Sequence, residues 1–194
     1  MGRLKFFSSE LVLGSLVAIL SILAALSGYQ SSMADSDQIR YNVQGQQALT
    51  DASAEYLSAN QLIVYDYTLY NGWYTAETAE KTEHYRSSFS EELNASMATN
   101  QEEPFNKAYY TAMYLEPQAQ FDEADRLFEL AEEFNRRGDA LRLVLLISAL
   151  GLALAAWASL LKTESPVRIA FGIFSTSMLV YSVILYLRVP VVAV

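Results

Sequence analysis

The chain has 194 residues, of which 52% are hydrophobic and 18% are charged. These values are too apolar and too lightly charged for an ordinary soluble domain, so they favour a membrane protein. Cys is absent, which excludes a disulfide framework, a Cys-ligated metal site and a thiol nucleophile. The single His, His84, excludes zinc motifs with two His and di-iron sites with paired Glu-x-x-His motifs.

The first apolar stretch is residues 11–34, which carry no charged side chain. Because about 20 apolar residues cross a bilayer as a helix, segment 1–34 is predicted to be an N-terminal tail and a first transmembrane helix. Arg3 and Lys5 precede the stretch and Ala25-Leu26-Ser27 is an acceptable cleavage pattern, so a secretory signal peptide is the alternative. We interpret the stretch as a retained anchor.

The middle segment, residues 35–141, holds 20 of the 22 acidic residues and 7 of the 13 basic ones. Such an acidic surface repels nucleic acid, which we therefore exclude as a partner. Apolar residues recur at helical spacing along both ends of the segment, which predicts helices that continue outward from the membrane and return to it. The outgoing set is Ile39, Val43, Leu49, Ala52, Tyr56, Ala59 and Ile63, and the returning set is Phe121, Ala124, Phe128, Ala131 and Phe134.

The middle segment leaves and re-enters the same membrane face, so it contains an even number of long helical arms. A single hairpin that turns near Pro104 would have arms of very unequal length, because each helical residue adds only about 1.5 Å. We therefore expect the outgoing arm to reverse near Asn71-Gly72 and to form a small bundle. A hairpin with a folded tip is the alternative. Pro117 is read as a further break.

Two more spans follow within segment 142–188, at residues 143–161 and 169–187. Their link is so short that they must form an antiparallel hairpin, and residues 189–194 form a C-terminal tail. Ser165 is expected to cap the third span with Pro166 at its first position. The fold class is therefore all-α, with three transmembrane helices and an acidic helical bundle or helical hairpin between spans 1 and 2.

The positive-inside rule is the basis for the orientation, although the basic residues are divided almost equally. One side has Arg3, Lys5, Lys162 and Arg168, and the other has Arg40, Arg136, Arg137, Arg142 and Arg188. Because the N-terminus resembles a start-transfer signal and the hairpin link is basic, we place both in the cytoplasm. The acidic domain and the C-terminus are then extracytoplasmic.

Two sets of residues are candidates for interaction. Small residues at helical spacing let membrane helices approach closely, either within this chain or between subunits. They are Gly14, Ala18, Ala24, Gly28, Ala149, Gly151, Ala153 and Ala155. Aromatic residues concentrated in one run could build a core, an oligomer seam or a surface for a protein or a small ligand. They are Tyr65, Tyr67, Tyr70, Trp73 and Tyr74.

The sequence predicts no catalytic chemistry. Glu80 and His84 lie four residues apart beside Glu77, but such a group on an acidic helix is more typical of a solvated surface than of a metal site. No phosphate-binding glycine loop or nucleophile elbow is present in the sequence. We therefore expect no catalytic residues, no metal site, no bound cofactor and no enzymatic activity.

The layout resembles a family of small three-span bacterial membrane proteins, an uncharacterised domain-of-unknown-function family. The resemblance lies in a single N-terminal span followed by Gly28-Tyr29-Gln30 and a Gln/Ala-rich helix, the Glu-rich residues 123–137, and the closing pair of spans. Trp73-Tyr74 is followed here by Thr75-Ala76-Glu77, whereas the family often has basic residues there. The resemblance implies a multi-pass protein of the bacterial cytoplasmic membrane and implies no activity.

These patterns favour a non-enzymatic integral membrane protein that acts in assembly. It would contact membrane lipids and either copies of itself or other subunits, as a homo-oligomer or an accessory subunit of a larger complex. One alternative is an extracytoplasmic ligand sensor, although only short segments would face the cytoplasm. The other is an oligomeric channel lined by Ser175, Thr176 and Ser177.

Overall fold

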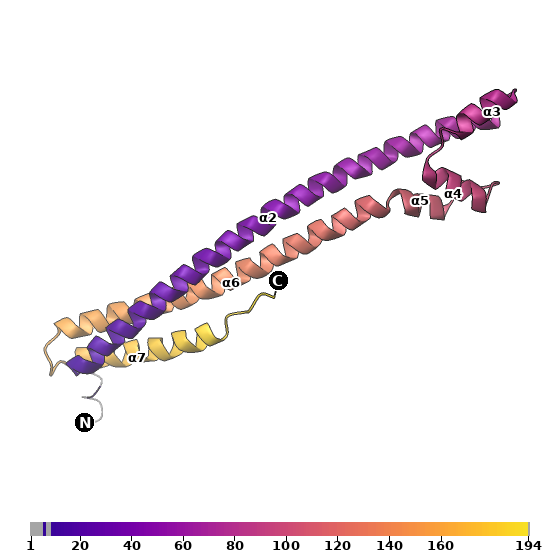
Figure 1. Ribbon diagram of the computed structural model, residues 1–194. Coiled ribbons are helices and arrows are strands. Elements are labelled where there is room, and N and C mark those ends of the chain that lie inside the picture. The colour runs from indigo at the N-terminus through magenta and orange to yellow at the C-terminus, as the bar shows by residue number, and fades with distance from the viewer. Residues whose placement is uncertain (1–5, 7–8, 194) are drawn as a thin grey trace. The chain divides into compact units, whose positions relative to one another are not determined.

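The computed structural model describes residue 6 and residues 9–193, and it contains no strand among them. Arg3 and Lys5, which support the predicted orientation, lie outside the described residues. The described helices are α2 (Glu10–Tyr74), α3 (Ala79–Arg86), α4 (Glu91–Thr99), α5 (Lys107–Met113), α6 (Leu115–Leu160) and α7 (Pro166–Leu187), all of which are drawn in Figure 1.

Three of these helices, α2, α6 and α7, are long and apolar enough to cross a membrane. This confirms the all-helical fold class and the three span-capable segments. The limits agree closely with the sequence prediction, since α2 begins one residue before the predicted first span and α6 ends one residue before the predicted end of the second. The helix predicted to continue beyond span 1 is confirmed, because α2 runs without a break to Tyr74.

Two compact units divide the chain. Unit 1 comprises Met1–Asn42 and Glu129–Val194, and unit 2 comprises Val43–Phe128. Both ends of the acidic segment 35–141 therefore pack with the span-capable helices rather than with the rest of the segment. The boundaries of unit 2, at residues 43 and 128, therefore lie inside the acidic segment 35–141. Both α2 and α6 extend across these boundaries.

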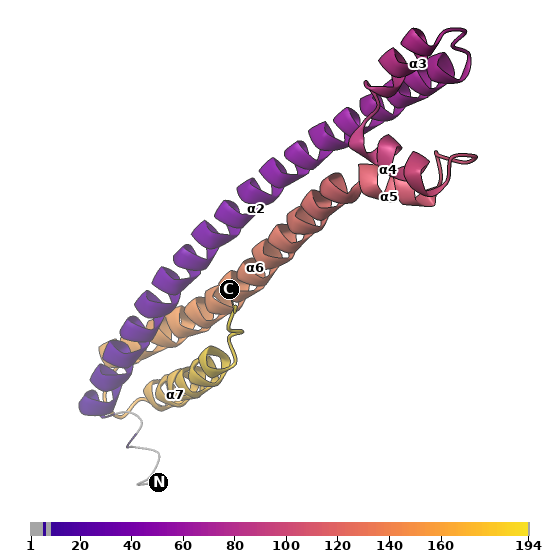
Figure 2. The same ribbon diagram turned by 45° about the vertical axis from the view of Figure 1, so that its right-hand side comes forward.

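Unit 1 is built from the first part of α2, the second part of α6 and α7, which lie side by side in both views (Figures 1 and 2). Buried residues of α2 in this unit are three, four or seven positions apart, which is the spacing of helices that pack with interdigitated side chains. They are Leu13, Leu16, Leu20, Ser27, Ser31, Ala34 and Tyr41. Leu13, Leu16 and Leu20 form one cluster with Ala155 and Ala158 of α6.

Unit 2 is a helical hairpin whose tip is a small bundle of short helices, so it contains parts of both predicted alternatives. The outgoing helix ends at Tyr74, a few residues after the predicted reversal. The short helices α3, α4 and α5 then pack near the C-terminal end of α2, and α6 begins at Leu115. The unequal arm lengths are thus accommodated by the tip, which covers the last turns of α2 with apolar side chains.

The prediction that Asn71-Gly72 reverses the chain is wrong by a few residues, because both residues lie inside the last turns of α2. No described glycine has a positive φ, so Gly72 serves no turn. A Cβ atom at Gly72 would lie 2.5 Å from the ring of Tyr85 in α3. Gly72 is therefore needed for the close approach of the tip to α2.

The other predicted punctuation marks have mixed outcomes. The break predicted near Pro117 is confirmed: α5 ends at Met113 and α6 begins at Leu115, so Pro117 lies in the first turn of α6, where its missing N–H would have no helical partner. Ser165 is the N-cap residue of α7 and Pro166 follows it, as predicted. The Ser165 side chain, however, makes no capping hydrogen bond. Helix α7 ends at Leu187, before Pro190.

Candidate functional site

The tip of unit 2 is an aromatic cluster built on the last turns of α2. Its buried core consists of Ile63, Leu69, Phe89, Leu93, Met97, Tyr109 and Met113, with Tyr70, Trp73, Tyr85, Phe105, Tyr110 and Tyr114 packed against it. Tyr67 stacks on Phe105 at a ring-centroid distance of 3.9 Å. Aromatic rings bury large areas and give defined pair geometries, so this cluster fixes α3–α5 against α2.

The five aromatic residues considered for a core, a seam or a binding surface differ in their surroundings. Tyr70 and Trp73 pack against the tip core, and Tyr67 stacks on Phe105. Tyr65, Tyr67 and Tyr74 are exposed, at 54%, 39% and 75% of their accessible area. The run is therefore partly core and partly surface.

A buried carboxylate that sequence reasoning missed lies at the centre of the tip. Asp66 is completely buried, and its Oδ1 accepts a hydrogen bond from the Ser90 backbone N–H at 3.1 Å. Its Oδ2 accepts from the Ser90 hydroxyl at 2.5 Å and from the Tyr109 hydroxyl at 2.8 Å. These bonds tie α2 to the N-terminus of α4, where Ser90 is the cap, and to α5. Asp66 thereby organises the whole tip.

The same network changes the acidity of tyrosines. Burial, together with the hydrogen bond to the Asp66 carboxylate, raises the pKa of Tyr109 far above its usual value. A hydrogen bond between the hydroxyls of Tyr67 and Tyr110, 2.6 Å apart, raises the pKa of Tyr110 to about 12. Both groups are thus held neutral, which suits structural hydrogen bonds rather than proton transfer near neutral pH.

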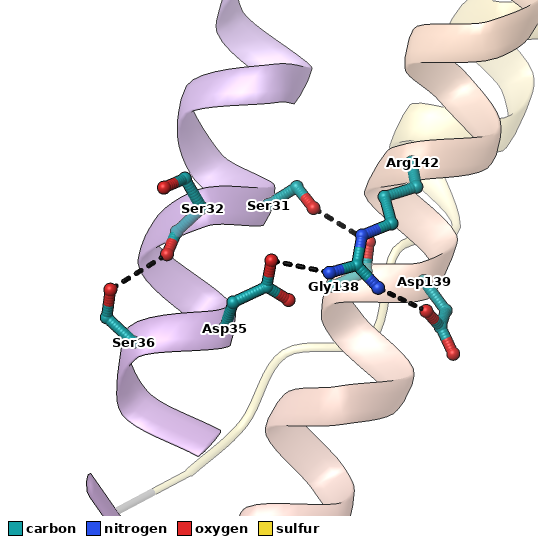
Figure 3. Close-up of polar contacts among 7 residues, drawn as sticks. All are labelled: Ser31, Ser32, Asp35, Ser36, Gly138, Asp139 and Arg142. Carbon is teal, nitrogen blue, oxygen red and sulfur yellow. Dashed lines mark hydrogen bonds and ion pairs between the residues drawn. The ribbon is translucent and has the colours of Figure 1, made fainter. Parts of the chain in front are cut away.

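In unit 1 a polar seam joins α2 and α6 just beyond the apolar stretches (Figure 3). The Arg142 guanidinium bonds the Asp35 carboxylate at 2.5 Å and the Asp139 carboxylate at 2.9 Å. Ser31 donates to the Gly138 carbonyl at 3.1 Å. A Cβ atom at Gly138 would lie 2.9 Å from Asp35 Oδ1, so the helices approach closely here because position 138 has no side chain.

The small residues predicted for membrane packing separate into covered and uncovered positions. Gly151 and Ala155 are buried, and a Cβ atom at Gly151 would lie 2.9 Å from Met178 Cβ and 3.2 Å from the Leu20 side chain. Gly28 and Ala24 are half-buried. A Cβ atom at Gly28 would lie 3.7 Å from the Leu145 side chain. These positions pack helices within this chain.

The remaining small residues are uncovered. Gly14, Ala18, Ala149 and Ala153 are all exposed, and a Cβ atom at Gly14 would meet nothing within 4 Å. Ala153 lines a shallow apolar groove between α6 and α7 together with Leu150, Leu154, Trp157, Phe171 and Met178. This chain therefore uses some of its small residues for internal packing and leaves the others on the surface.

The three hydroxyl residues considered for a channel lining have different surroundings. Ser175 is fully buried and donates to the Gly151 carbonyl at 2.8 Å, which ties α7 to α6. Thr176 and Ser177 bond carbonyls one turn earlier in α7, at Gly172 and Ile173. Consecutive residues point in different directions on a helix, so the three do not form one polar face.

The Glu77, Glu80 and His84 group lies on an exposed surface of the tip, where α3 has no buried residue. No three His, Asp or Glu side chains in the described part of the chain are arranged to hold a metal ion. An open groove between α2 and α6 in unit 2 is lined by Asp51, Glu55 and Glu123, and Glu123 forms a bidentate pair with Arg126.

Comparison with known proteins gives no match. No protein-family model, no curated protein and no solved structure is similar to this chain.

Proposed function

We propose that this chain is a non-enzymatic, multi-pass membrane protein that acts in assembly, either as a homo-oligomer or as an accessory subunit of a larger membrane complex. The observation that carries the proposal is the division of the small residues in the span-capable helices. Gly151 and Ala155 are buried by packing within unit 1. In contrast, four small residues of the apolar helices are exposed, namely Gly14, Ala18, Ala149 and Ala153. Close approach of a further helix at such positions is favourable in a bilayer.

Unit 2 supports the same proposal, because its buried polar groups are used to build structure. Asp66 accepts three hydrogen bonds within unit 2, and one of the donors is the Tyr109 hydroxyl, whose pKa is raised by burial and by this bond. In the proposed arrangement α2, α6 and α7 cross a bacterial cytoplasmic membrane, and unit 2 forms most of an extracytoplasmic acidic domain. Membership of the three-span bacterial family that the layout resembles is part of this proposal.

Native mass spectrometry of the full chain, purified from its own membranes in mild detergent, tests the assembly role. We expect either a multiple of 21.7 kDa or additional subunits of other mass. A monodisperse monomer of 21.7 kDa with no co-purifying protein contradicts the proposal.

The orientation has its own test, which uses the absence of Cys from the sequence. Thr111 is exposed in unit 2, and Glu164 is exposed in the link between α6 and α7. The variants Thr111→Cys and Glu164→Cys each place a single thiol at one of these positions. With an impermeant maleimide on intact cells, we expect labelling at position 111 and none at position 164 until the cells are lysed. The opposite pattern would place the acidic domain in the cytoplasm.

A further inference from the structure

One face of α2 in unit 2 carries no charge and is covered by nothing in the described structure. Between Tyr56 and Ala76 the only charged residue is Asp66, and that side chain is completely buried in the tip. The exposed surface of this stretch is therefore uncharged along its whole length. It is also partly apolar, with Leu57 at 61% and Val64 at 65% exposure.

The exposed residues opposite the tip form a continuous line along the helix. Leu57, Gln61, Val64, Tyr65 and Thr68 are all exposed, and we call them the outer stripe. Their spacing of four, three, one and three residues places them on one face of a helix. The buried residues Ile63, Asp66 and Leu69 lie on the opposite side and contact the tip. The outer stripe is thus an uncharged, partly apolar helix face that no described residue of the chain covers.

The rest of unit 2 is strongly acidic. Residues 43–128 hold 14 Asp and Glu against 4 Lys and Arg, and exposed carboxylates occur on α3, α4 and α6. Like charges held opposite one another destabilise a contact, so two copies of this unit would repel across those helices. The outer stripe is a surface of more than three helical turns on which no carboxylate would face another. A basic partner, in contrast, would be attracted to the carboxylate faces and not to this one.

We propose that the outer stripe is where a second copy of this chain docks, through the same stripe on the partner copy. The inference rests on the proposed function, because copies inserted in one membrane share an orientation and their α2 helices then run parallel. In a symmetric parallel pair, each stripe residue lies opposite its own counterpart. A stripe of three turns is a small interface, but confinement to one membrane raises the effective concentration of the second copy.

Single-cysteine crosslinking tests this arrangement directly, because the chain contains no other Cys. Leu57→Cys, Gln61→Cys and Val64→Cys are made in the full chain and oxidised in native membranes. Each is expected to give a disulfide-linked species of twice 21.7 kDa, at a yield at least five-fold above that of Thr111→Cys. Thr111 is the matched control, because it is exposed in the same unit but lies on α5.

A second control lies on α2 itself. Leu62 is 38% exposed and, one residue beyond Gln61, is rotated by about 100° from it around the helix axis. Leu62→Cys is therefore expected to crosslink less than Gln61→Cys. Equal yields at all these positions, no species above the control, or crosslinks only to a different polypeptide would each overturn the proposal.

Charge at position 61 gives an independent test on a Val64→Cys background. Gln61→Glu or Gln61→Lys alone places two like charges opposite each other, so each is expected to lower the crosslink yield about ten-fold. Co-expression of the two variants creates opposite charges and is expected to restore the yield. Failure of this rescue, while circular dichroism shows normal helix content, would refute a self-facing stripe.

Failure of this inference can be distinguished from failure of the proposed function. If the stripe variants do not crosslink but native mass spectrometry still finds several copies or other subunits, assembly proceeds elsewhere and only the stripe proposal is wrong. A bare monomer in the same measurement refutes both proposals.

Discussion

Unit 1 and unit 2 are held together by different means, since unit 1 joins long helices to one another and the tip of unit 2 joins short helices to the end of α2. In unit 1 the helices approach closely at residues with little or no side chain, such as Gly138 and Gly151, and serine hydroxyls bond carbonyls across the gaps. In unit 2 large aromatic side chains surround one buried carboxylate, Asp66. Small residues suit helices with apolar surfaces on all sides, whereas an aromatic core suits an acidic unit that must bury apolar area.

The largest expected effect is in unit 2, from Asp66→Ala. This change removes the acceptor of three hydrogen bonds and leaves the Ser90 N–H and the Tyr109 hydroxyl buried without it. We expect a loss of about 3 kcal/mol in the stability of the tip, the usual upper range for hydrogen bonds to a charged group. Limited trypsin digestion measures it, because Lys81, Arg86 and Lys107 lie in the tip.

The control for that experiment is Asp66→Asn, which keeps the shape and one acceptor oxygen and should show a smaller increase in cleavage. Digestion within unit 1 should remain unchanged in both variants. A wild-type cleavage pattern for Asp66→Ala would mean that the tip is held by its aromatic contacts alone.

The next effect is in unit 1, where Gly151→Leu is compared with Gly14→Leu. The new side chain at position 151 would collide with Met178 and Leu20, and overpacking of this kind costs about 1–3 kcal/mol. Gly14 has nothing within 4 Å of an added Cβ, so the same change there should leave the thermal stability of the monomer unaltered. Thermal unfolding in detergent, followed by loss of helical circular dichroism, separates the two.

The Gly14→Leu variant also sharpens the proposed function. If the exposed small residues contact another subunit, this variant should keep its thermal stability yet lose part of its assembly in native mass spectrometry. Equal destabilisation by Gly14→Leu and Gly151→Leu would contradict the structure, because it would mean that position 14 is as tightly packed within the monomer as position 151.

Alkaline pH should affect unit 2 through Tyr109. Its raised pKa means that above pH 10 the unfolded chain releases a proton that the folded tip retains. Stability is therefore expected to fall as the pH rises above 10, by up to about 1.4 kcal/mol per pH unit for each retained proton. Tyr110, with a pKa of about 12, adds to this slope.

Thermal unfolding between pH 9 and pH 11, followed by circular dichroism, measures this dependence. Tyr109→Phe removes the titrating group and should flatten the dependence, although it lowers stability at neutral pH by removing the bond to Asp66. An unchanged slope in Tyr109→Phe would assign the alkaline loss to other tyrosines.

The smallest effect compares two buried serines of unit 1. Ser175→Ala removes the hydrogen bond to the Gly151 carbonyl, and such bonds between membrane helices contribute about 0.6 kcal/mol on average. The Ser148 hydroxyl is fully buried with no hydrogen-bond partner within the described structure, so Ser148→Ala should be neutral or stabilising. Thermal unfolding of both variants in one detergent checks the sign of this difference.

Much of the fold was predictable because the long helices obey a single period. The uncharged runs at residues 11–34, 143–161 and 169–187 predict the span-capable parts of α2, α6 and α7 to within a few residues. The short helices of the tip also carry readable signals, since α3, α4 and α5 begin after Thr78, Ser90 and Asn106, whose side chains accept capping hydrogen bonds.

The organisation of the tip was harder to predict, because it depends on contacts between distant residues. The bonds from Asp66 to Ser90 and Tyr109 span 24 and 43 positions, which no local period encodes. One signal was available: Asp66 shares a helix face with Ile63 and Leu69, and a lone charge among apolar residues on one face indicates a buried polar group. The glycine at position 72 was misread because glycines serve close approach as well as turns.

The seven-residue spacing of buried side chains in α2 limits how this chain can change in length. An inserted residue would turn all later side chains by about 100° around the helix axis, and Ser31, Ala34 and Tyr41 would leave the contact face. Insertions or deletions of about seven or about eleven residues preserve that face, because each turns the helix by a nearly whole number of turns. Length variation in this protein is therefore expected in the links, at residues 75–78, 100–106 and 161–165, and in the long helices only in steps of these sizes.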